Sequence, residues 1–198
     1  MTGKRGARMP GALLASALML VSCASSGSRI YVNPDADMNF YKKVAVLPFA
    51  SLSPDQLAGP RVTRAFITEL IMTNRYEIVQ PEEFRPVLEQ VGGLPGSQGT
   101  MDPAKLKDAA GKVGATGIIR GAVSEYQMQR SGSGDTPVIS FDVEMIDVGT
   151  GNVVWRASIA RRGKGRIPVL GGGGARTFGK LTQMACEELV DRLRREAL

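Results

Sequence analysis

Hydrophobic residues recur along the chain with two different periods, and these periods predict its strands and helices. From Ile139 to Met145 every second residue is large and apolar, a period of two that is typical of a strand with one buried face. Spacings of three and four in 60–74, and again after 175, indicate helices with one apolar face. We expect strands at 43–49, 76–79, 116–128, 137–148 and 152–162, and helices at 60–74, 81–91, 103–113 and from about 175.

This order, β-α-β-α-α-β-β-β-α, predicts a single α/β domain over residues 43–198. Its economical architecture is one mixed sheet with helices packed on it in layers. Gly149-Thr150-Gly151 suits a three-residue hairpin loop with Gly151 in the left-handed conformation. Such a loop places Met145 opposite Trp155 and Glu144 opposite Arg156, so that apolar side chains meet apolar ones and opposite charges meet.

The first 22 residues have the pattern of a secretory signal peptide. Three cations and no acid precede the apolar run 12–21, which at roughly 15 Å is half of the ~30 Å membrane core and too short to span it. Leu20-Val21-Ser22-Cys23 follows and resembles the lipobox of bacterial lipoproteins. In that family the cysteine is acylated, with palmitate among its chains, and becomes the first residue of the mature protein. We therefore expect a signal peptide at 1–22, lipidation of Cys23 and a short tether over 23–42.

The residue after the cysteine is Ala24 and not aspartate, which by the sorting rule of that family implies the outer membrane, on its periplasmic side. Each acyl CH₂ contributes ~0.8 kcal/mol, so several chains anchor a protein stably. The Ser/Gly-rich start of the tether, 24–28, reaches at most about 18 Å. We therefore expect the folded domain to lie close to the membrane that holds its lipid.

Composition excludes several kinds of chemistry. The 198 residues include no histidine, which excludes catalytic triads with histidine and histidine-ligated metal sites. Two cysteines are too few for a disulfide framework or a four-thiolate zinc site. Cys186, on a helix beside two glutamates, is expected to be a structural thiol. Removal of the leader with its three cations lowers the net charge from +6 to +3, which does not indicate nucleic-acid binding.

Two further patterns are candidates for a catalytic or ligand-binding site. Residues 174–180 fit the G-x-x-x-x-G-K part of a phosphate-binding loop, but Leu181 stands where Mg²⁺ requires a hydroxyl, so we expect no nucleotide. Asp142 and Glu144 share one strand face, as the carboxylates of an exported hydrolase would. Arg156 opposite Glu144 favours a solvated sheet face instead. We expect no cofactor, no metal and no enzyme activity, with the carboxylate-dependent hydrolase as the alternative from another class.

Cations gather after the last expected strand. No acid occurs between Gly149 and Cys186, whereas Arg161, Arg162, Lys164 and Arg166 follow one another closely. Because the expected sheet offers them no partner, we predict an uncompensated basic loop. Such a loop near a membrane can contact lipid phosphates, cell-wall carboxylates or an acidic protein. A merely solvated loop is the simpler alternative.

Three segments carry a family resemblance. Residues 44–49 (VAVLPF), 115–123 (ATGIIRGAV) and 147–155 (DVGTGNVVW) resemble the strand ends and the D-x-x-T-G-x-x-x-W hairpin of the periplasmic lipoproteins grouped with the curli-secretion protein CsgG. The cell-wall activator LpoB and the N-terminal domain of TolB are similar in style. The resemblance covers nearly all of 43–195 and implies a CsgG/LpoB-like fold. Its motifs are turn glycines and core aromatics, so no catalytic residue is implied.

The same resemblance implies a function. It points to a non-enzymatic accessory or assembly subunit of an envelope secretion or cell-wall complex, with an envelope protein as partner and room for a homo-oligomer. Activation of a peptidoglycan synthase, as by LpoB, is the alternative. CsgG-type channels insert two transmembrane hairpins per subunit, and the loops at 92–102, 129–135 and 163–174 are too short and polar for these. We therefore expect no pore.

Overall fold

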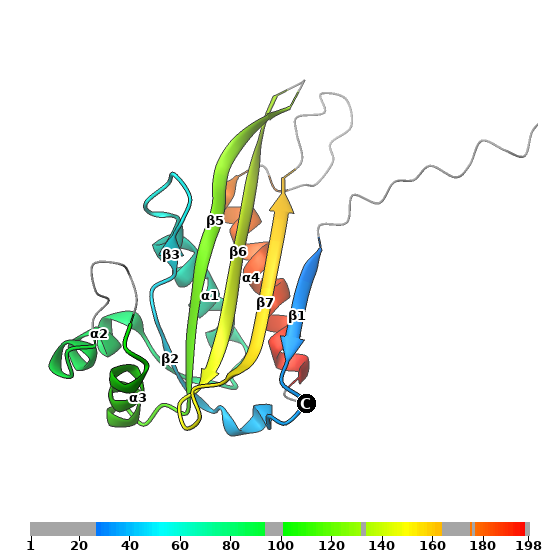
Figure 1. The fold of residues 1–198 in the computed structure, drawn as a ribbon. Helices are drawn as coiled ribbons and strands as arrows, with labels where there is room; N and C mark the ends of the chain where they lie inside the picture. Colours follow the sequence, from blue (N-terminus) through cyan, green and yellow to red (C-terminus); the bar gives the residue numbers. More distant parts are fainter. Residues whose placement is uncertain (1–26, 94–100, 132–133, 164–174, 176, 197–198) are drawn as a thin grey trace, which may run out of the picture.

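The computed structural model describes residues 27–93, 101–131, 134–163, 175 and 177–196. They form one seven-stranded mixed sheet with helices packed on it (Figure 1), which confirms the predicted fold class. The strand order is β1-β7-β6-β5-β2-β4, and β3 pairs with β5 beside this path. The strands are β1 (Ser28–Val32), β2 (Lys43–Val46), β3 (Ala50–Ser51), β4 (Glu77–Val79), β5 (Gly117–Ser131), β6 (Gly134–Asp147) and β7 (Val153–Arg162).

Helices cover the two faces of the sheet unequally. The helices are α1 (Ala58–Met72), α2 (Pro81–Gln90), α3 (Pro103–Lys112) and α4 (Phe178–Glu196). Successive residues of a strand point to opposite faces; Val44 and Val46 of β2 belong to the core under α1 and α4, whereas Ala45 and Leu47 pack with α2 and α3. Of the described helices, only α2 and α3 cover the second face, beside β2 and β4, and none lies on it over β6, β7 and β1 (Figure 1). We call this part the open face.

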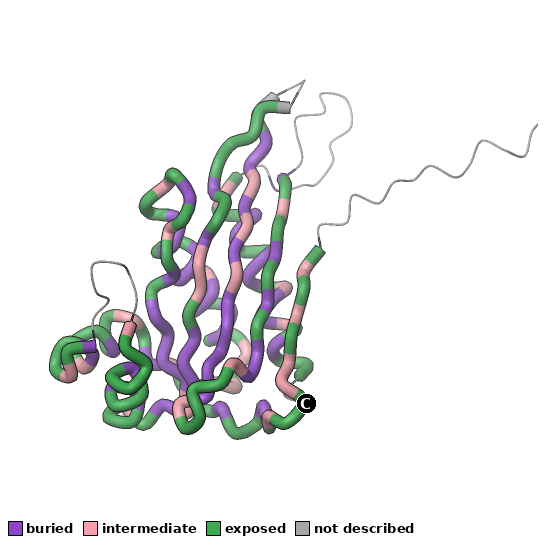
Figure 2. Tube along the Cα trace, viewed as in Figure 1, coloured by how far each residue is buried: buried purple, intermediate pink, exposed green. Residues whose placement is uncertain are grey.

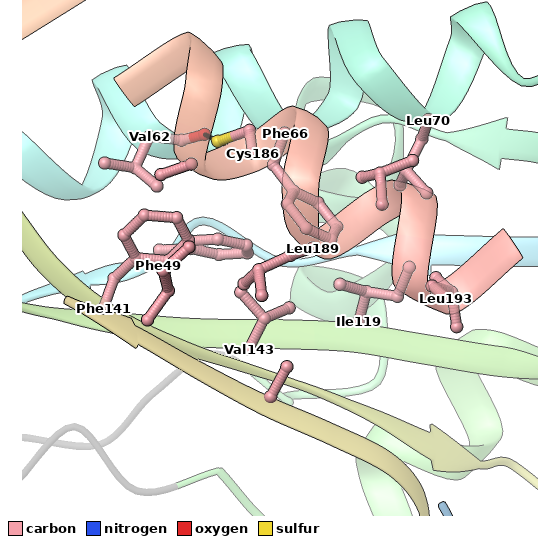
Figure 3. Close-up of a cluster of buried hydrophobic side chains, with 14 of the residues drawn as sticks. Phe49, Val62, Phe66, Leu70, Ile119, Phe141, Val143, Cys186, Leu189 and Leu193 are labelled. Atoms are coloured by element: carbon pink, nitrogen blue, oxygen red, sulfur yellow. Dashed lines mark hydrogen bonds between the residues drawn. The ribbon is translucent and has the colours of Figure 1, made fainter. Parts of the chain in front are cut away.

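The main core lies between the sheet and the pair α1 and α4. Phe66 and Leu189 of these helices lie over Phe141 and Val143 of β6 (Figure 3), and all four are buried. Cys186 is buried in the same layer, with its Sγ 3.9 Å from the carbonyl oxygen of Val62. Burial raises the pKa of this thiol far above its usual range. These surroundings are those expected of a structural thiol.

The β6–β7 hairpin has the predicted register over its paired strands as far as Met145; next to the turn the register shifts, and Ile146 lies opposite Val153. Met145 lies opposite Trp155, and Glu144 lies opposite Arg156. Gly151 has φ +78°, the left-handed conformation that a three-residue loop requires and that glycine adopts without steric cost. The matching of apolar with apolar and of oppositely charged residues in the sequence was therefore sufficient to predict these pairs.

Residues 28–42, predicted to be part of a tether, belong instead to the folded unit. β1 pairs antiparallel with β7, and Met38 and Tyr41 are buried. The physical reason is that β7 would otherwise be an edge whose buried face, including Trp155, lacks a neighbour. The short alternating run Ser28–Val32 supplies that neighbour, but five residues are too few to stand out from a Ser/Gly-rich context.

Strands β5 and β6 are longer than predicted. Residues 129–135 were expected to form a loop, but Gln129 pairs with Thr136 and Arg130 with Asp135. An antiparallel ladder satisfies backbone donors and acceptors whatever the side chains, so it continues through polar residues. The β5–β6 hairpin therefore extends beyond the end of β7 (Figure 1). Helix α4 begins at Phe178, slightly later than the predicted 175.

Candidate functional site

The start of β1 and the basic end of β7 lie side by side. Ser28, the first residue of β1, is opposite Ile159, and β7 ends three residues later at Arg162. The pairing is antiparallel, so the chain enters β1 at the end of the sheet where β7 finishes. We call this the basic end; it also carries the tip of the β5–β6 hairpin (Figure 1).

Helix α4 supplies a carboxylate to the basic end. Ser28 Oγ donates a hydrogen bond to Glu188 Oε1 at 2.7 Å, and the Arg161 guanidinium forms an ion pair with the same carboxylate. The sequence predicted an uncompensated Arg161, and for this residue the prediction is wrong. Glu188 is 27 positions away in the chain and comes close only because α4 packs behind β7.

The remaining cations of the run differ in their surroundings. Arg162 is exposed in the last pair of the β6–β7 ladder, opposite Val138, and donates to Gln129 Oε1 on β5. Lys164 and Arg166 lie outside the described residues. Gly163 and Ala175, the described residues on either side of 164–174, lie against each other at the basic end: a Cβ on Gly163 would lie 2.4 Å from the carbonyl oxygen of Ala175.

The predicted lipidation site also lies outside the described residues, but its distance from the basic end is limited. Cys23 precedes Ser28 by five residues, which span at most about 18 Å when fully extended. A lipidated Cys23 would therefore be held within that distance of Ser28, which lies opposite Ile159, three residues before the end of β7. In the described part of the chain, no helix has the length and apolar character needed to cross a membrane.

The two carboxylates of the hydrolase alternative lie on the open face among arginines. Glu144 Oε1 accepts from Arg120 Nε at 2.6 Å, and its Oε2 lies 3.6 Å from Arg156 Nη1. Arg156 also lies 4.0 Å from Asp142. Burial raises the pKa of Asp142, and the Arg156 charge opposes that rise. These contacts join β5, β6 and β7 across the open face, as expected for a structural ion-pair row.

A cavity of about 270 Å³ lies at the opposite end of the sheet, between α3 and the β6–β7 turn. Lys107 and Arg120 contribute cations to its wall, and Ile118 and Ile146 contribute apolar surface. Lys107 Nζ donates to the carbonyl oxygen of Gly149, so this cation closes the wall of the cavity. Neither Asp142 nor Glu144 lines the cavity. Nowhere among the described residues do three or more potential metal-ligating side chains lie close enough together to hold a metal ion.

Comparison with known proteins establishes the fold. No protein-family model matches the chain, and a search of curated proteins finds no match. The PelC dodecamer from Paraburkholderia phytofirmans superposes with a TM-score of 0.59 and 21% identity, over 84% of this chain and 96% of that one. Lipoprotein GNA1162 from Neisseria meningitidis superposes with a TM-score of 0.52 and 15% identity, over 78% and 99% of the two chains.

The LpoB C-terminal domain from Salmonella enterica is more remote, with a TM-score of 0.46 and 20% identity over 61% of this chain and 82% of that one. The predicted mixed α/β fold with one sheet is shared with the structures of PelC and GNA1162. At these identities the likeness concerns the fold alone.

Proposed function

We propose that the protein is a non-enzymatic, lipid-anchored accessory subunit on the periplasmic side of the outer membrane, and that it assembles from identical copies within an envelope secretion or cell-wall complex. The observation that carries this proposal is the position of β1. Its first residue leaves the sheet at the basic end, five residues after Cys23. An acyl anchor there would hold Arg162 against the phosphate layer of a membrane.

Three further observations support the proposal. The two carboxylates on the open face, Asp142 and Glu144, form ion pairs with arginines of the neighbouring strands. GNA1162, which shares this fold, is a lipoprotein. PelC, which also shares it, forms a dodecamer. Self-association and a lipid anchor are therefore known among proteins with this fold, and we extend both to this chain.

The anchor is tested by Cys23→Ser in the full chain, expressed in a Gram-negative host with labelled palmitate. We expect complete loss of the label and release of the protein from the membrane fraction, because the substituted residue has no sulfur to form the thioether. Cys186→Ser is the matched control and should keep both the label and the membrane location, since Cys186 is buried. Normal labelling of the Cys23→Ser protein would contradict the proposal.

The accessory role is tested by crosslinking the lipidated protein in intact envelopes and identifying what purifies with it. We expect components of one envelope export or cell-wall complex. Recovery of a peptidoglycan synthase that the purified protein stimulates would support the activator alternative instead. Hydrolase activity that disappears in Asp142→Asn or Glu144→Gln would contradict a non-enzymatic role.

A further inference from the structure

The sheet has two free edges that run in opposite directions. Among the described strands, β1 pairs only with β7 and β4 pairs only with β2. From β1 to β5 each neighbour is antiparallel, whereas β5, β2 and β4 are parallel to one another. β1 and β4 are therefore antiparallel to each other. If a second copy is related to the first by a rotation about an axis parallel to the strands, the strand directions are kept. β1 of one copy can then lie beside β4 of the next in antiparallel orientation.

β1 lacks several of the features by which natural edge strands avoid pairing. It contains no proline, lysine or bulge. Ile30 and Val32 point to the helix side and are half-buried, while Arg29 and Tyr31 point to the open face. Tyr31 is 51% exposed, and the side chains of Arg29 and Tyr31 make no hydrogen bond or ion pair to another described residue. Figure 2 shows this alternation of half-buried and exposed residues along β1.

β4 offers a complementary surface. Ile78 is half-buried on the helix side, in register with Val44, and Glu77 lies on the other face in register with Lys43. The Glu77 side chain is 69% exposed and pairs with Lys43 at 2.6 Å. Ile71 and Met72, at the end of α1 just before β4, are 51% and 69% exposed. This edge thus has apolar surface on the helix side and a carboxylate on the other side.

We propose that β1 of one copy pairs antiparallel with β4 of a second copy, so that copies join head to tail through one continuous sheet. The inference rests on the self-association proposed above and specifies its surface. With Ile30 opposite Ile78 of the neighbouring copy, apolar side chains meet on the helix side, continuous with both cores. In that register Tyr31 faces Glu77, and Arg29 lies diagonally from it, within reach of a long side chain.

The alternative in which two β1 strands pair with each other fits the proposed anchor less well. Antiparallel pairing of identical edges requires a two-fold axis perpendicular to the sheet, which reverses one copy relative to the other. The two basic ends would then point in opposite directions and could not both face one membrane. Pairing of β1 with β4 keeps all basic ends on one side, and because the contact is heterologous it is repeated by every added copy.

The pairing is tested by the double variant Tyr31→Cys/Glu77→Cys in the full chain. Within one copy these residues are five strand spacings apart, about 24 Å, far beyond the distance that a disulfide spans. Any disulfide between them is therefore intermolecular. Under mild oxidation in the envelope we expect a ladder of dimers, trimers and larger species. The control Ser158→Cys/Glu77→Cys, with its first cysteine on the same face but one strand inside the edge, should give no ladder.

The single variant Tyr31→Cys and the size of the parent protein in solution distinguish the β1–β4 pairing from other modes of association. Dimers from Tyr31→Cys alone, with no ladder from the double variant, would overturn the inference in favour of paired β1 strands. Light scattering of the detergent-extracted parent measures self-association independently. Oligomers without a ladder would overturn the β1–β4 surface and leave the proposed function standing, whereas a monomer at all concentrations would contradict both.

Discussion

At the scale of single residues, Asp147 links distant parts of the chain. Its carboxylate accepts hydrogen bonds from the Thr150 backbone N–H at 2.5 Å, the Thr150 hydroxyl at 2.8 Å and the Tyr41 hydroxyl at 3.0 Å. Burial by itself would raise its pKa, but these bonds stabilise the ionised form and the net pKa is lowered. The sequence showed Asp147 and Thr150 as parts of a hairpin motif. It could not show Tyr41, which reaches Asp147 only when η1 (Met38–Phe40) turns the chain beneath the sheet.

We therefore expect Asp147→Asn to lower the free energy of unfolding by about 1–3 kcal/mol at pH 7, because it weakens hydrogen bonds made to a charge. A carboxyl group with a lowered folded-state pKa stabilises the fold above its unfolded-state pKa of ~4 and loses this contribution as the pH falls through the folded-state value. Urea unfolding should show the same difference from the parent at pH 7 and pH 5 and a smaller one at pH 3.5. Asp135→Asn, at an exposed ion pair, is the control. An equally large difference at every pH would contradict this role.

At the scale of elements, β1 is a strand that the hydrophobic pattern of the sequence did not predict. The β6–β7 register was predictable because Met145, Trp155, Glu144 and Arg156 select one another locally across a three-residue loop. β1 pairs with a strand more than 120 residues later in the chain, and its local sequence is equally compatible with a tether. Its conformation depends on the free edge of β7, which exists only in the folded sheet.

We expect a chain that starts at residue 43 to be much less stable than one that starts at residue 27. The longer chain keeps β1 and the buried Met38 and Tyr41. Fully buried side chains of this size contribute ~1.5–3 kcal/mol each, so the loss should be about 5 kcal/mol or more. Urea unfolding of the two chains, both without the lipid, measures the difference. Equal stabilities would show that residues 28–42 are a tether after all.

At the scale of the whole molecule, the basic charge and the chain entry occupy one end of the sheet. Arg162, the start of β1 and both flanks of the segment 164–174 meet there, while Lys107 and the cavity beside it lie at the other end. Cys23 and the cations were each visible in the sequence. That the chain enters β1 at the end of the sheet where Arg162 lies was not visible, because it depends on β1 lying antiparallel to β7.

This asymmetry predicts binding to anionic membranes even without the anchor. With Cys23→Ser as parent, the triple variant Arg162→Glu/Lys164→Glu/Arg166→Glu should bind phosphatidylglycerol vesicles about 100-fold more weakly, since each cation near such a surface contributes ~1 kcal/mol. Lys107→Glu, at the opposite end, is the control and should change little. Flotation at two salt concentrations measures the effect, which should be smaller at high salt. Undiminished binding of the triple variant would exclude a lipid contact at this end.

The sequence by itself determined the fold class, most strand and helix positions and the β6–β7 register. It also supplied the candidate lipidation site at Cys23, because periodicity, turn glycines and the lipobox pattern are local signals. The tertiary structure decided that β1 belongs to the sheet, that Glu188 compensates Arg161 and that Tyr41 binds Asp147. These contacts join residues 27 to more than 120 positions apart, and no local pattern encodes them, since each forms only when packing brings its partners to the same place.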